Sequence, residues 1–270
     1  MLKQFTKIVI STIAFASMQI LASPVNLGKA GSYTLLSHGT TWNEMPLYGN
    51  LELGSEALIN GNVGVRHTLN MAHGAVVVGN ADFGSLTKNP GATINGAESI
   101  QSSNFWDALY NDVKSASQTA KAMTGVNAGY INSTQTFTRQ GNVSVFNIIG
   151  LNLGSGKSLT LKGNENDVFI INVDYLGFTL SGGASIELDG VSYQNVLFNI
   201  HGMLNMGHVN VAAGKMQGTY IAPNGYFQLG DGLELNNVRF LGAGISGNLQ
   251  FVCGAFPVDP VDPVDPVDPS

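Results

Sequence analysis

The most constraining feature of the sequence is a succession of short apolar runs that glycine and asparagine interrupt every few residues. It is clearest between Gln194 and Phe227, where the runs VLFNI, LNM, VNV and MQGTYIA are separated by turn-forming residues. Apolar residues recur at about every second position, a period that indicates strands rather than helices. Short strands with repeating corners favour a solenoid, in which each coil of the chain stacks a strand on the previous coil.

The same texture occupies the segment from Leu47 to Ala97. Its corners carry four glycine–asparagine pairs, namely Gly49-Asn50, Asn60-Gly61, Gly79-Asn80 and Asn95-Gly96. These two residue types tolerate the positive φ angle that a sharp corner needs. Two-residue β-hairpins also favour Asn-Gly, so this segment alone leaves a series of hairpins open as an alternative.

A second strand-like part follows residue 142, after a polar segment from Gly125 to Asn142 that we expect to be a connection. Three-residue alternations with one outward residue are what a coil of a solenoid offers. The predicted strands are Phe146–Ile149, Leu151–Leu153, Leu159–Leu161, Val168–Val173, Phe178–Leu180, Ile186–Leu188, Val196–Phe198, Leu233–Leu235, Val238–Phe240 and Leu249–Phe251.

One segment has a helical period instead. Asn95 followed by Glu98 resembles a capping box, and Gly125 is a typical stop signal. The helix expected over about 96–124 is roughly 42 Å long at about 1.5 Å per residue, which matches about nine strands stacked about 4.8 Å apart. Its apolar stripe comprises Phe105, Leu109, Val113, Ala116, Ala120 and Met123. The predicted fold is therefore mainly β, a right-handed parallel β-solenoid (β-helix) with one long α-helix packed alongside.

The beginning of the chain has the pattern of a secretory signal peptide. Lys3 and Lys7 precede an apolar run from Ile8 to Leu21. This run is short for a membrane span, which needs about 20 apolar residues, and Ala22 suits a cleavage site. We expect residues 1–22 to be removed on secretion, with an N-terminal membrane anchor as the alternative. No later segment is apolar and long enough to span a bilayer, so none is expected in the mature chain.

The end of the chain is of low complexity. Residues 257–270 consist of Pro257 followed by four Val-Asp-Pro repeats and a serine. Such a segment favours an extended, polyproline-like conformation and not a packed core. We therefore expect a disordered spacer over 257–270, and a single solenoid domain over 23–256.

Composition excludes several classes of function. Charged residues make up 11% of the chain and the formal net charge is −6, against about 25% charged residues in an average soluble domain. The sequence contains no basic patch, so nucleic acid is not an expected partner. Cys253 is the only cysteine, which excludes an internal disulfide, and we expect it to be a small buried or half-buried residue near the end of the domain.

Two glycine-rich segments resemble nucleotide-binding motifs. Residues 242–247 match G-x-G-x-x-G, and residues 150–158 resemble a P-loop. Both motifs need a helix directly afterwards to present its N-terminus to phosphate. Strand-like residues follow the first segment and no helix follows the second. We therefore predict that the chain binds neither a dinucleotide nor a nucleoside triphosphate, and that it needs no cofactor.

No arrangement typical of a metal or catalytic site is apparent. The five histidines, His38, His67, His73, His201 and His208, lack the short spacing of a metal motif. The oxygen-rich segment 164–167 suits a Ca²⁺ turn but lacks the order of a dedicated loop. Asp174 and Asp189 could align on neighbouring coils, yet the other acids are scattered. We predict no enzyme activity and assign no catalytic, cofactor or metal residues.

The motifs resemble those of the choice-of-anchor A domain family. The relevant residues are Gln194-Asn-Val-Leu-Phe-Asn-Ile200, followed by Gly218-Thr-Tyr-Ile-Ala-Pro-Asn-Gly225, with Val145–Asn147 and the strand Val168–Val173 before them. The resemblance covers about residues 25–252. It implies a bacterial protein that is secreted or displayed on the cell surface, and some members of that family are collagen-binding-like.

The arrangement is also distantly similar to ice-binding-like β-solenoids, which bind ice through flat rows of threonine and small residues. Thr160, Thr179 and Thr219 could form such a row. Protein or glycan binding would instead suit the irregular set Asn172, Asp174, Tyr220 and Tyr226. We predict a secreted, non-enzymatic adhesion or matrix-interaction protein with an extracellular macromolecule or surface as its partner, and ice binding as the alternative. The binding face stays unassigned.

Overall fold

The computed structural model describes residues 24–39, 49–154, 156–201, 208–211, 214–230, 233–247 and 249–253, and the statements below concern these residues. The predicted signal peptide (1–22) and spacer (257–270) lie outside them, and so do the outer limits of the predicted domain at 23 and 256. Among the described helices, none is long and apolar enough to cross a lipid bilayer.

The described residues form nineteen strands, one α-helix and two short 3₁₀ helices. Before the α-helix lie η1 (Gly28–Ser32), β1 (Tyr33–Ser37), β2 (Leu51–Asn60), β3 (Asn62–Met71), β4 (Val76–Val77), β5 (Ala81–Lys88), β6 (Thr93–Ile94) and β7 (Glu98–Ile100). After α1 (Ser103–Ala122) come β8 (Val126–Ile131), β9 (Gln135–Thr138), β10 (Val143–Leu153), β11 (Ser158–Lys162), β12 (Val168–Val173), β13 (Phe178–Leu180), β14 (Ala184–Asp189), η2 (Tyr193–Asn195), β15 (Val196–Ile200), β16 (His208–Val211), β17 (Gly214–Leu229), β18 (Leu233–Ser246) and β19 (Leu249–Cys253).

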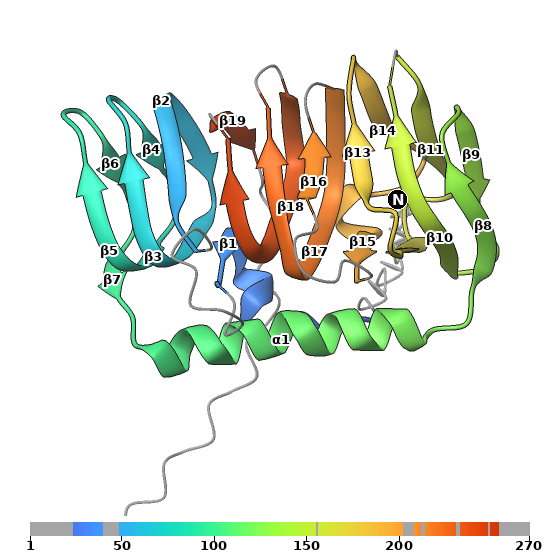
Figure 1. Cartoon of the computed structure of the whole chain (residues 1–270), viewed down its shortest axis with the longest axis horizontal. Helices are drawn as coiled ribbons and strands as arrows, with labels where there is room; N and C mark the ends of the chain where they lie inside the picture. Colours follow the sequence, from blue (N-terminus) through green and yellow to red (C-terminus); the bar gives the residue numbers. More distant parts are fainter. Residues whose placement is uncertain are drawn as a thin grey trace, which may run out of the picture.

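Every strand pair is parallel, and the strands coil into one elongated body with α1 along its side (Figure 1). Consecutive strands of a hairpin would be antiparallel, so the hairpin alternative is wrong. The predicted class, a mainly β parallel solenoid with one long helix, is confirmed. Most predicted strands are present, several of them joined into longer strands that continue around a corner, as in β10 and β18.

The order of the coils differs from the order of the chain. Strand β1 lies in the middle of the stack, and β2 to β7 build one end of the body. Helix α1 then carries the chain to the opposite end, and β8 to β19 return toward the middle (Figure 1). The two halves meet where Leu35 of β1 pairs with Phe240 of β18, and where Asn60 of β2 pairs with Cys253 of β19.

The helix begins later than predicted. Glu98 pairs with Ala81 as the first residue of β7, so the expected capping box of Asn95 and Glu98 is wrong. Ser102 is the N-cap residue, in extended conformation. An added strand on the sheet competes with helix propensity here, and the long-range pairing prevails. The segment 125–142, predicted as a connection, contains β8 and β9; this end coil buries only a few apolar side chains, including Ile131 and Phe137, which explains its weak signal.

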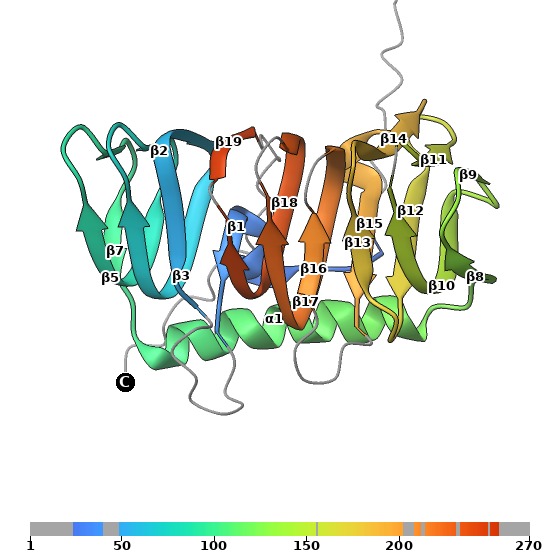
Figure 2. The ribbon, with the colours of Figure 1, turned by 45° about the horizontal axis from the view of Figure 1, so that its top comes forward.

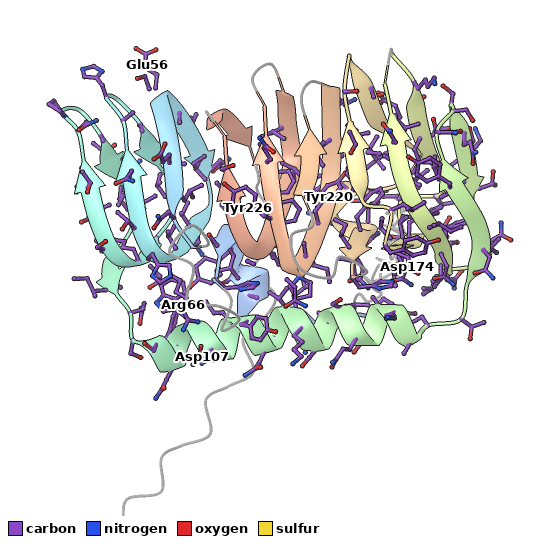
Figure 3. The ribbon with its side chains drawn as sticks, in the orientation of Figure 1. Glu56, Arg66, Asp107, Asp174, Tyr220 and Tyr226 are labelled. Carbon is purple, nitrogen blue, oxygen red and sulfur yellow. The ribbon has the colours of Figure 1, made fainter. Side chains whose placement is uncertain are left out.

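Helix α1 packs through one apolar stripe against the solenoid. Of the predicted stripe, Leu109, Val113, Ala116 and Ala120 are buried, whereas Phe105 and Met123 are only partly buried. Trp106, which the prediction omitted, is buried as well. The opposing surface comprises Leu36, Val145, Val168, Ile170, Leu197, Ile221 and Leu241. The N-terminal half of the helix is also held by the ion pair of Arg66 Nη1 and Asp107 Oδ1, at 2.7 Å (Figure 3).

Stacked corners explain the glycine–asparagine pairs. The Asn80 backbone N–H donates to Asn62 Oδ1 at 2.8 Å, and the Ala97 N–H donates to Asn80 Oδ1 at 2.9 Å. A Cβ atom on Gly96 would lie 2.6 Å from the carbonyl carbon of Gly79, a distance that only glycine avoids. The asparagine side chain therefore accepts a hydrogen bond from a backbone N–H at the corner of the next coil. Glycine allows the coils to approach one another.

The strand pairings fall into three stacks, which form three faces (Figures 1 and 2). The helix face includes β1, β12, β15 and the parts of β10, β17 and β18 that pair with them. The amide face includes β13, β16 and the later parts of β10, β17 and β18. The ion-pair face includes β9, β11, β14 and the beginnings of β17 and β18. Because α1 covers the first face, two faces are open to a partner.

Candidate functional site

The amide face carries a row of uncharged polar side chains. Asn152 pairs with Thr179, and Gln228 pairs with Ser246; Asn210 occupies the register position between Thr179 and Gln228. These four described side chains are exposed or half-buried, while their strand neighbours, such as Leu151 and Phe178, are buried. Strand alternation therefore points amide and hydroxyl groups outward from successive coils, about 4.8 Å apart.

In the other half of the solenoid, β2, β3 and β5 carry an outward row of a different character. Glu52 pairs with Asn70, and Asn70 pairs with Thr87. Glu52 and Thr87 are exposed and Asn70 is half-buried. Among the described side chains of this row, Glu52 is the only charged one. The uncharged part of the amide face is thus the part built by β10, β13, β17 and β18.

The ion-pair face differs by its charge. Lys162 and Asp189 form an ion pair, and Lys215 Nζ lies 3.3 Å from Glu187 Oε2. Thr160 lies in register with Glu187 on this face. Exposed ion pairs contribute little to stability, at most about 1 kcal/mol, but they keep a surface hydrated. The ion-pair face is therefore the less suitable one for a dry, regular contact.

The three threonines proposed as a single row lie on three different faces. Thr179 projects from the amide face, and Thr160 from the ion-pair face. Thr219 is buried on the helix face, with 4% of its surface exposed. The expected row of Thr160, Thr179 and Thr219 is therefore wrong, because the register between coils places equivalent-looking threonines on separate sheets.

The alternative set of binding residues is also divided. Tyr220 is buried in the interior, where its ring stacks on Phe198 with centroids 4.8 Å apart, and burial raises the pKa of its hydroxyl. Asn172 is buried beneath α1. Only Asp174, which is exposed, and Tyr226, which is half-buried and in register with Gly244, face outward (Figure 3). Burial therefore removes Tyr220 from the outer surface, and α1 covers Asn172 on the helix face.

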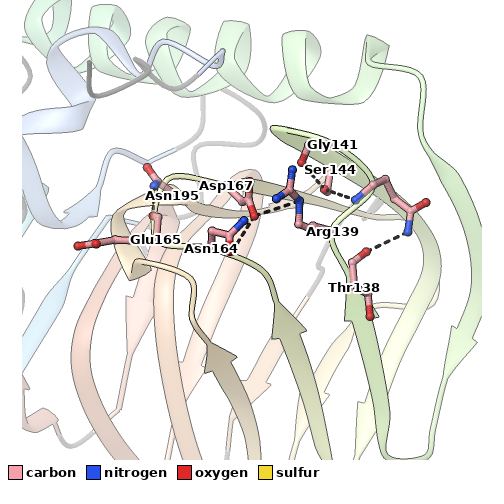
Figure 4. A network of polar contacts seen from close by, with 9 residues as sticks. Thr138, Arg139, Gly141, Ser144, Asn164, Glu165, Asp167 and Asn195 are labelled. Atoms are coloured by element: carbon pink, nitrogen blue, oxygen red, sulfur yellow. Dashed lines mark hydrogen bonds and ion pairs between the residues drawn. The ribbon is translucent and has the colours of Figure 1, made fainter. Parts of the chain in front are cut away.

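The segment considered for Ca²⁺ is occupied by an internal polar network (Figure 4). Asp167 is buried, its Oδ2 lies 3.3 Å from Arg139 Nε, and the same oxygen accepts a 2.6 Å hydrogen bond from the Asn164 backbone N–H. The carboxylate is thus satisfied by the protein itself. Over the residues that the structure describes, no group of three or more His, Cys, Asp or Glu side chains could hold a metal ion.

The other candidate chemistry is dispersed. Residues 242–246 belong to strand β18, and residues 150–153 belong to β10, so neither glycine-rich motif opens a helix. Asp189 pairs with Lys162 on the ion-pair face, whereas Asp174 lies at a corner between the helix and amide faces. The two carboxylates are not brought together. The side chain of Cys253 lies outside the described part of the chain.

Sequence reasoning missed Asn152, Gln228 and Ser246 as members of one outward row. A signal exists, since Asn152, Thr179 and Gln228 are each the middle residue of an apolar–polar–apolar triplet. The triplets predict strands, but nothing local predicts which of them pair across coils.

A search against protein families matches residues 25–237 to the "Putative Ice-binding-like adhesive domain" family. This is not the choice-of-anchor A family that the motifs resemble, so that resemblance stays a prediction. No curated protein sequence matches the chain.

Solved structures with a similar fold include three ice-binding proteins. That of the Antarctic ascomycete Antarctomyces psychrotrophicus is 20% identical with a TM-score of 0.56, over 86% of this chain and 99% of the other. The glycosylated protein of an Arctic yeast is 15% identical with a TM-score of 0.57, over 88% and 96%. That of an Antarctic Flavobacteriaceae bacterium is 21% identical with a TM-score of 0.58, over 90% of this chain and 51% of the other. At these identities the likeness shows the shared fold.

Proposed function

The chain belongs to the ice-binding-like adhesive domain family, and from this premise we propose that it is a secreted, non-enzymatic domain that adheres through its amide face to a surface of ordered hydroxyl groups. A polysaccharide or ice presents such groups.

The observation that carries the proposal is the outward row of Asn152, Thr179, Gln228 and Ser246. Amides and hydroxyls both donate and accept hydrogen bonds, so each matches a hydroxyl group in either orientation. A repeat of about 4.8 Å suits an extended, regular partner better than a single small molecule. The described side chains of this part of the row carry no charge. Removing water from them on binding therefore costs less free energy than it would for charged side chains.

A polysaccharide is the first candidate surface. Gln228 is exposed and longer than Thr179 and Ser246 of the same row, and half-buried Tyr226 lies two positions before it on β17. Side chains of unequal length give an uneven surface, which a flexible polymer can follow. An aromatic ring beside polar groups also suits the apolar face of a sugar.

Ice is the second candidate surface. The short side chains of Asn152, Thr179 and Ser246 leave most of the uncharged part of the row level, and the neighbours of similar fold are described as ice-binding proteins. A face without charges can hold ordered water against a crystal. Because Thr179 is the one threonine among the described side chains of this part of the row, we consider a polysaccharide first.

One experiment separates the surfaces. The secreted protein is incubated with cellulose particles, chitin particles, immobilised collagen and slowly frozen ice, and the bound fraction is measured for each. Retention by cellulose or chitin supports a polysaccharide, and retention by ice supports the second candidate. Retention by collagen alone, or by none of the four, would contradict the proposal.

A further inference from the structure

A second candidate site lies at the corner between the helix and amide faces, close to the C-terminal end of α1, where Asp174 is labelled in Figure 3. It is a cavity of about 430 Å³. Its polar lining comprises Lys121, Asn127, Asn147, Asn172, Asp174 and His201. Small-molecule sites in proteins commonly span about 300–1,000 Å³ and combine a few polar groups with apolar walls, so the cavity has the size of a site for a compact ligand.

The cavity lies at the open end of a ladder of asparagines. Asn199, Asn172, Asn147 and Asn127 occupy consecutive register positions on four adjacent strands of the helix face. Their amides form a chain, because Asn199 Nδ2 donates to Asn172 Oδ1 at 2.9 Å and Asn172 Nδ2 donates to Asn147 Oδ1 at 3.0 Å.

Helix α1 covers only the first two asparagines. Asn199 Nδ2 donates to the Ser117 carbonyl and Asn172 Nδ2 to the Ala120 carbonyl, both at 2.9 Å. The helix ends at Ala122, before the ladder does. Among the described residues, Asn147 Nδ2 and the Asn127 side chain have no hydrogen-bond partner. The helix thus supplies carbonyl acceptors to the amides of Asn199 and Asn172. It supplies none to the next two asparagines of the ladder, Asn147 and Asn127.

The strand pairing of the end coil is irregular beside the ladder. Opposite Asn147 and Ile148 of β10 stand Asn127 and Gly129 of β8, so Ala128 is an extra residue in a β-bulge. Gly129 has a φ of +70°, and a Cβ atom built on it would meet nothing within 4 Å. The bulge therefore opens space beside the unpaired amides instead of closing it.

The remaining groups are mixed in character. Lys121 and Asp174 bring one charge of each sign. His201 Nδ1 is buried without a hydrogen-bond partner among the described residues. Burial lowers the pKa of His201, Lys121 lowers it further, and Asp174 opposes both. A neutral imidazole can offer either a donor or an acceptor. Ile149, 38% exposed, adds an apolar wall.

From this arrangement we infer a second binding site that takes one saccharide unit, held by the uncovered amides of Asn127 and Asn147. A sugar hydroxyl both donates and accepts, so it can meet amides, imidazole, ammonium and carboxylate in one cavity, while a carbon-bound face rests on Ile149. One charge of each sign in the lining favours a neutral ligand over an ion. The site is distinct from the amide face and does not depend on the function proposed for that face.

Side-chain amide signals in NMR spectra of the isotopically labelled full-length protein test this inference. The probes are glucose, galactose, N-acetylglucosamine and their β-1,4-linked dimers. We expect at least one probe to shift the signals of Asn127 and Asn147 with a Kd of about 1 mM, and Asn127→Ala to weaken binding roughly tenfold through the loss of hydrogen bonds. Asp174→Asn, which leaves every backbone contact in place, should also weaken it.

The matched control is Asn111→Ala, which changes an exposed asparagine of α1 outside both proposed sites. It should leave saccharide binding unchanged. The inference is overturned if no probe shifts the two signals, or if Asn127→Ala binds as tightly as the unaltered chain. Saccharide binding in a protein that adheres to no surface would support this site and contradict only the function proposed for the amide face.

Discussion

Asn199 and Ser117 join the solenoid to its helix through two reciprocal hydrogen bonds. Asn199 Nδ2 donates to the Ser117 carbonyl at 2.9 Å, and Ser117 Oγ donates to Asn199 Oδ1 at 2.6 Å. Both residues are buried, so neither amide nor hydroxyl has water as an alternative partner. The apolar stripe of α1 could slide along the helix face, whereas this pair sets one position of the helix along the stack.

Replacing Asn199 should therefore cost more than an ordinary polar substitution. Asn199→Ala removes both bonds and the donation to Asn172 Oδ1, and it leaves the Ser117 hydroxyl buried without its acceptor. We therefore expect a loss of about 2–3 kcal/mol in the free energy of unfolding. Urea denaturation measures it. The control Asn152→Ala, at an exposed position, should change the same quantity by less than about 0.5 kcal/mol. Equal effects would show that the ladder does not hold the helix.

The helix stripe makes a second stability prediction. Leu109 is 1% exposed, and Leu109→Asp would place an unpaired charge between α1 and the solenoid. We expect destabilisation by several kcal/mol, about 3 or more, seen as a large drop in the melting temperature. Gln118→Asp, on the exposed side of the same helix, is the matched control. An unchanged melting temperature for Leu109→Asp would mean that the stripe is not buried.

The lowered pKa of buried His38 predicts that the free energy of unfolding depends on pH. Burial lowers its pKa from 6.5 to about 4; the Arg66 guanidinium lowers it as well, and the hydrogen bond of Nδ1 with the Gly39 carbonyl opposes both. Between pH 6.5 and about 4, His38 binds a proton in the unfolded chain but not in the folded chain. The free energy of unfolding should thus fall by about 3 kcal/mol as the pH falls from 6.5 to 4.

Denaturation curves of the unaltered chain and of His38→Gln over that pH range isolate this contribution. The Tyr110 ring packs 5.4 Å from the His38 ring, and Asp107 is paired with Arg66, so the neighbouring groups remain in the variant. The variant should lose less stability on acidification. Parallel curves for the two proteins would show that folding does not lower the pKa of His38.

Export is predicted from the first residues alone. Lys3, Lys7 and the apolar run that follows indicate cleavage after Ala22. Mass spectrometry of the protein from the culture medium should find an N-terminus near Ser23. A product that starts at Met1 and stays in the cytosol would remove the secretory interpretation.

The local pattern of the sequence was sufficient for the fold class. The period-two alternation of strands such as Phe178–Leu180 and the apolar stripe of α1 depend on neighbouring residues only. The start of α1 was mispredicted because Glu98 pairs with Ala81, and the position of β1 was missed because Leu35 pairs with Phe240. Both pairings join residues that are distant in the chain.

The binding face was unpredictable for the same reason. Thr160 and Thr179 each stand between two apolar residues, and their local contexts are nearly identical. Only the register between coils places Thr179 beside Asn152 on the amide face and Thr160 beside Glu187 on the ion-pair face. Sequence could predict that both point outward, but not that they belong to different surfaces.

That difference provides the most direct test of the proposed function. The same substitution, threonine to tyrosine, is made at Thr179 and at Thr160, and the adsorption of each secreted variant to cellulose, chitin and ice is measured beside that of the unaltered chain. A bulky ring at Thr179 breaks the level row, so we predict that Thr179→Tyr reduces adsorption at least roughly tenfold, about 1.4 kcal/mol, while Thr160→Tyr leaves it unchanged. Full adsorption of Thr179→Tyr, or an equal loss in Thr160→Tyr, would contradict binding through the amide face.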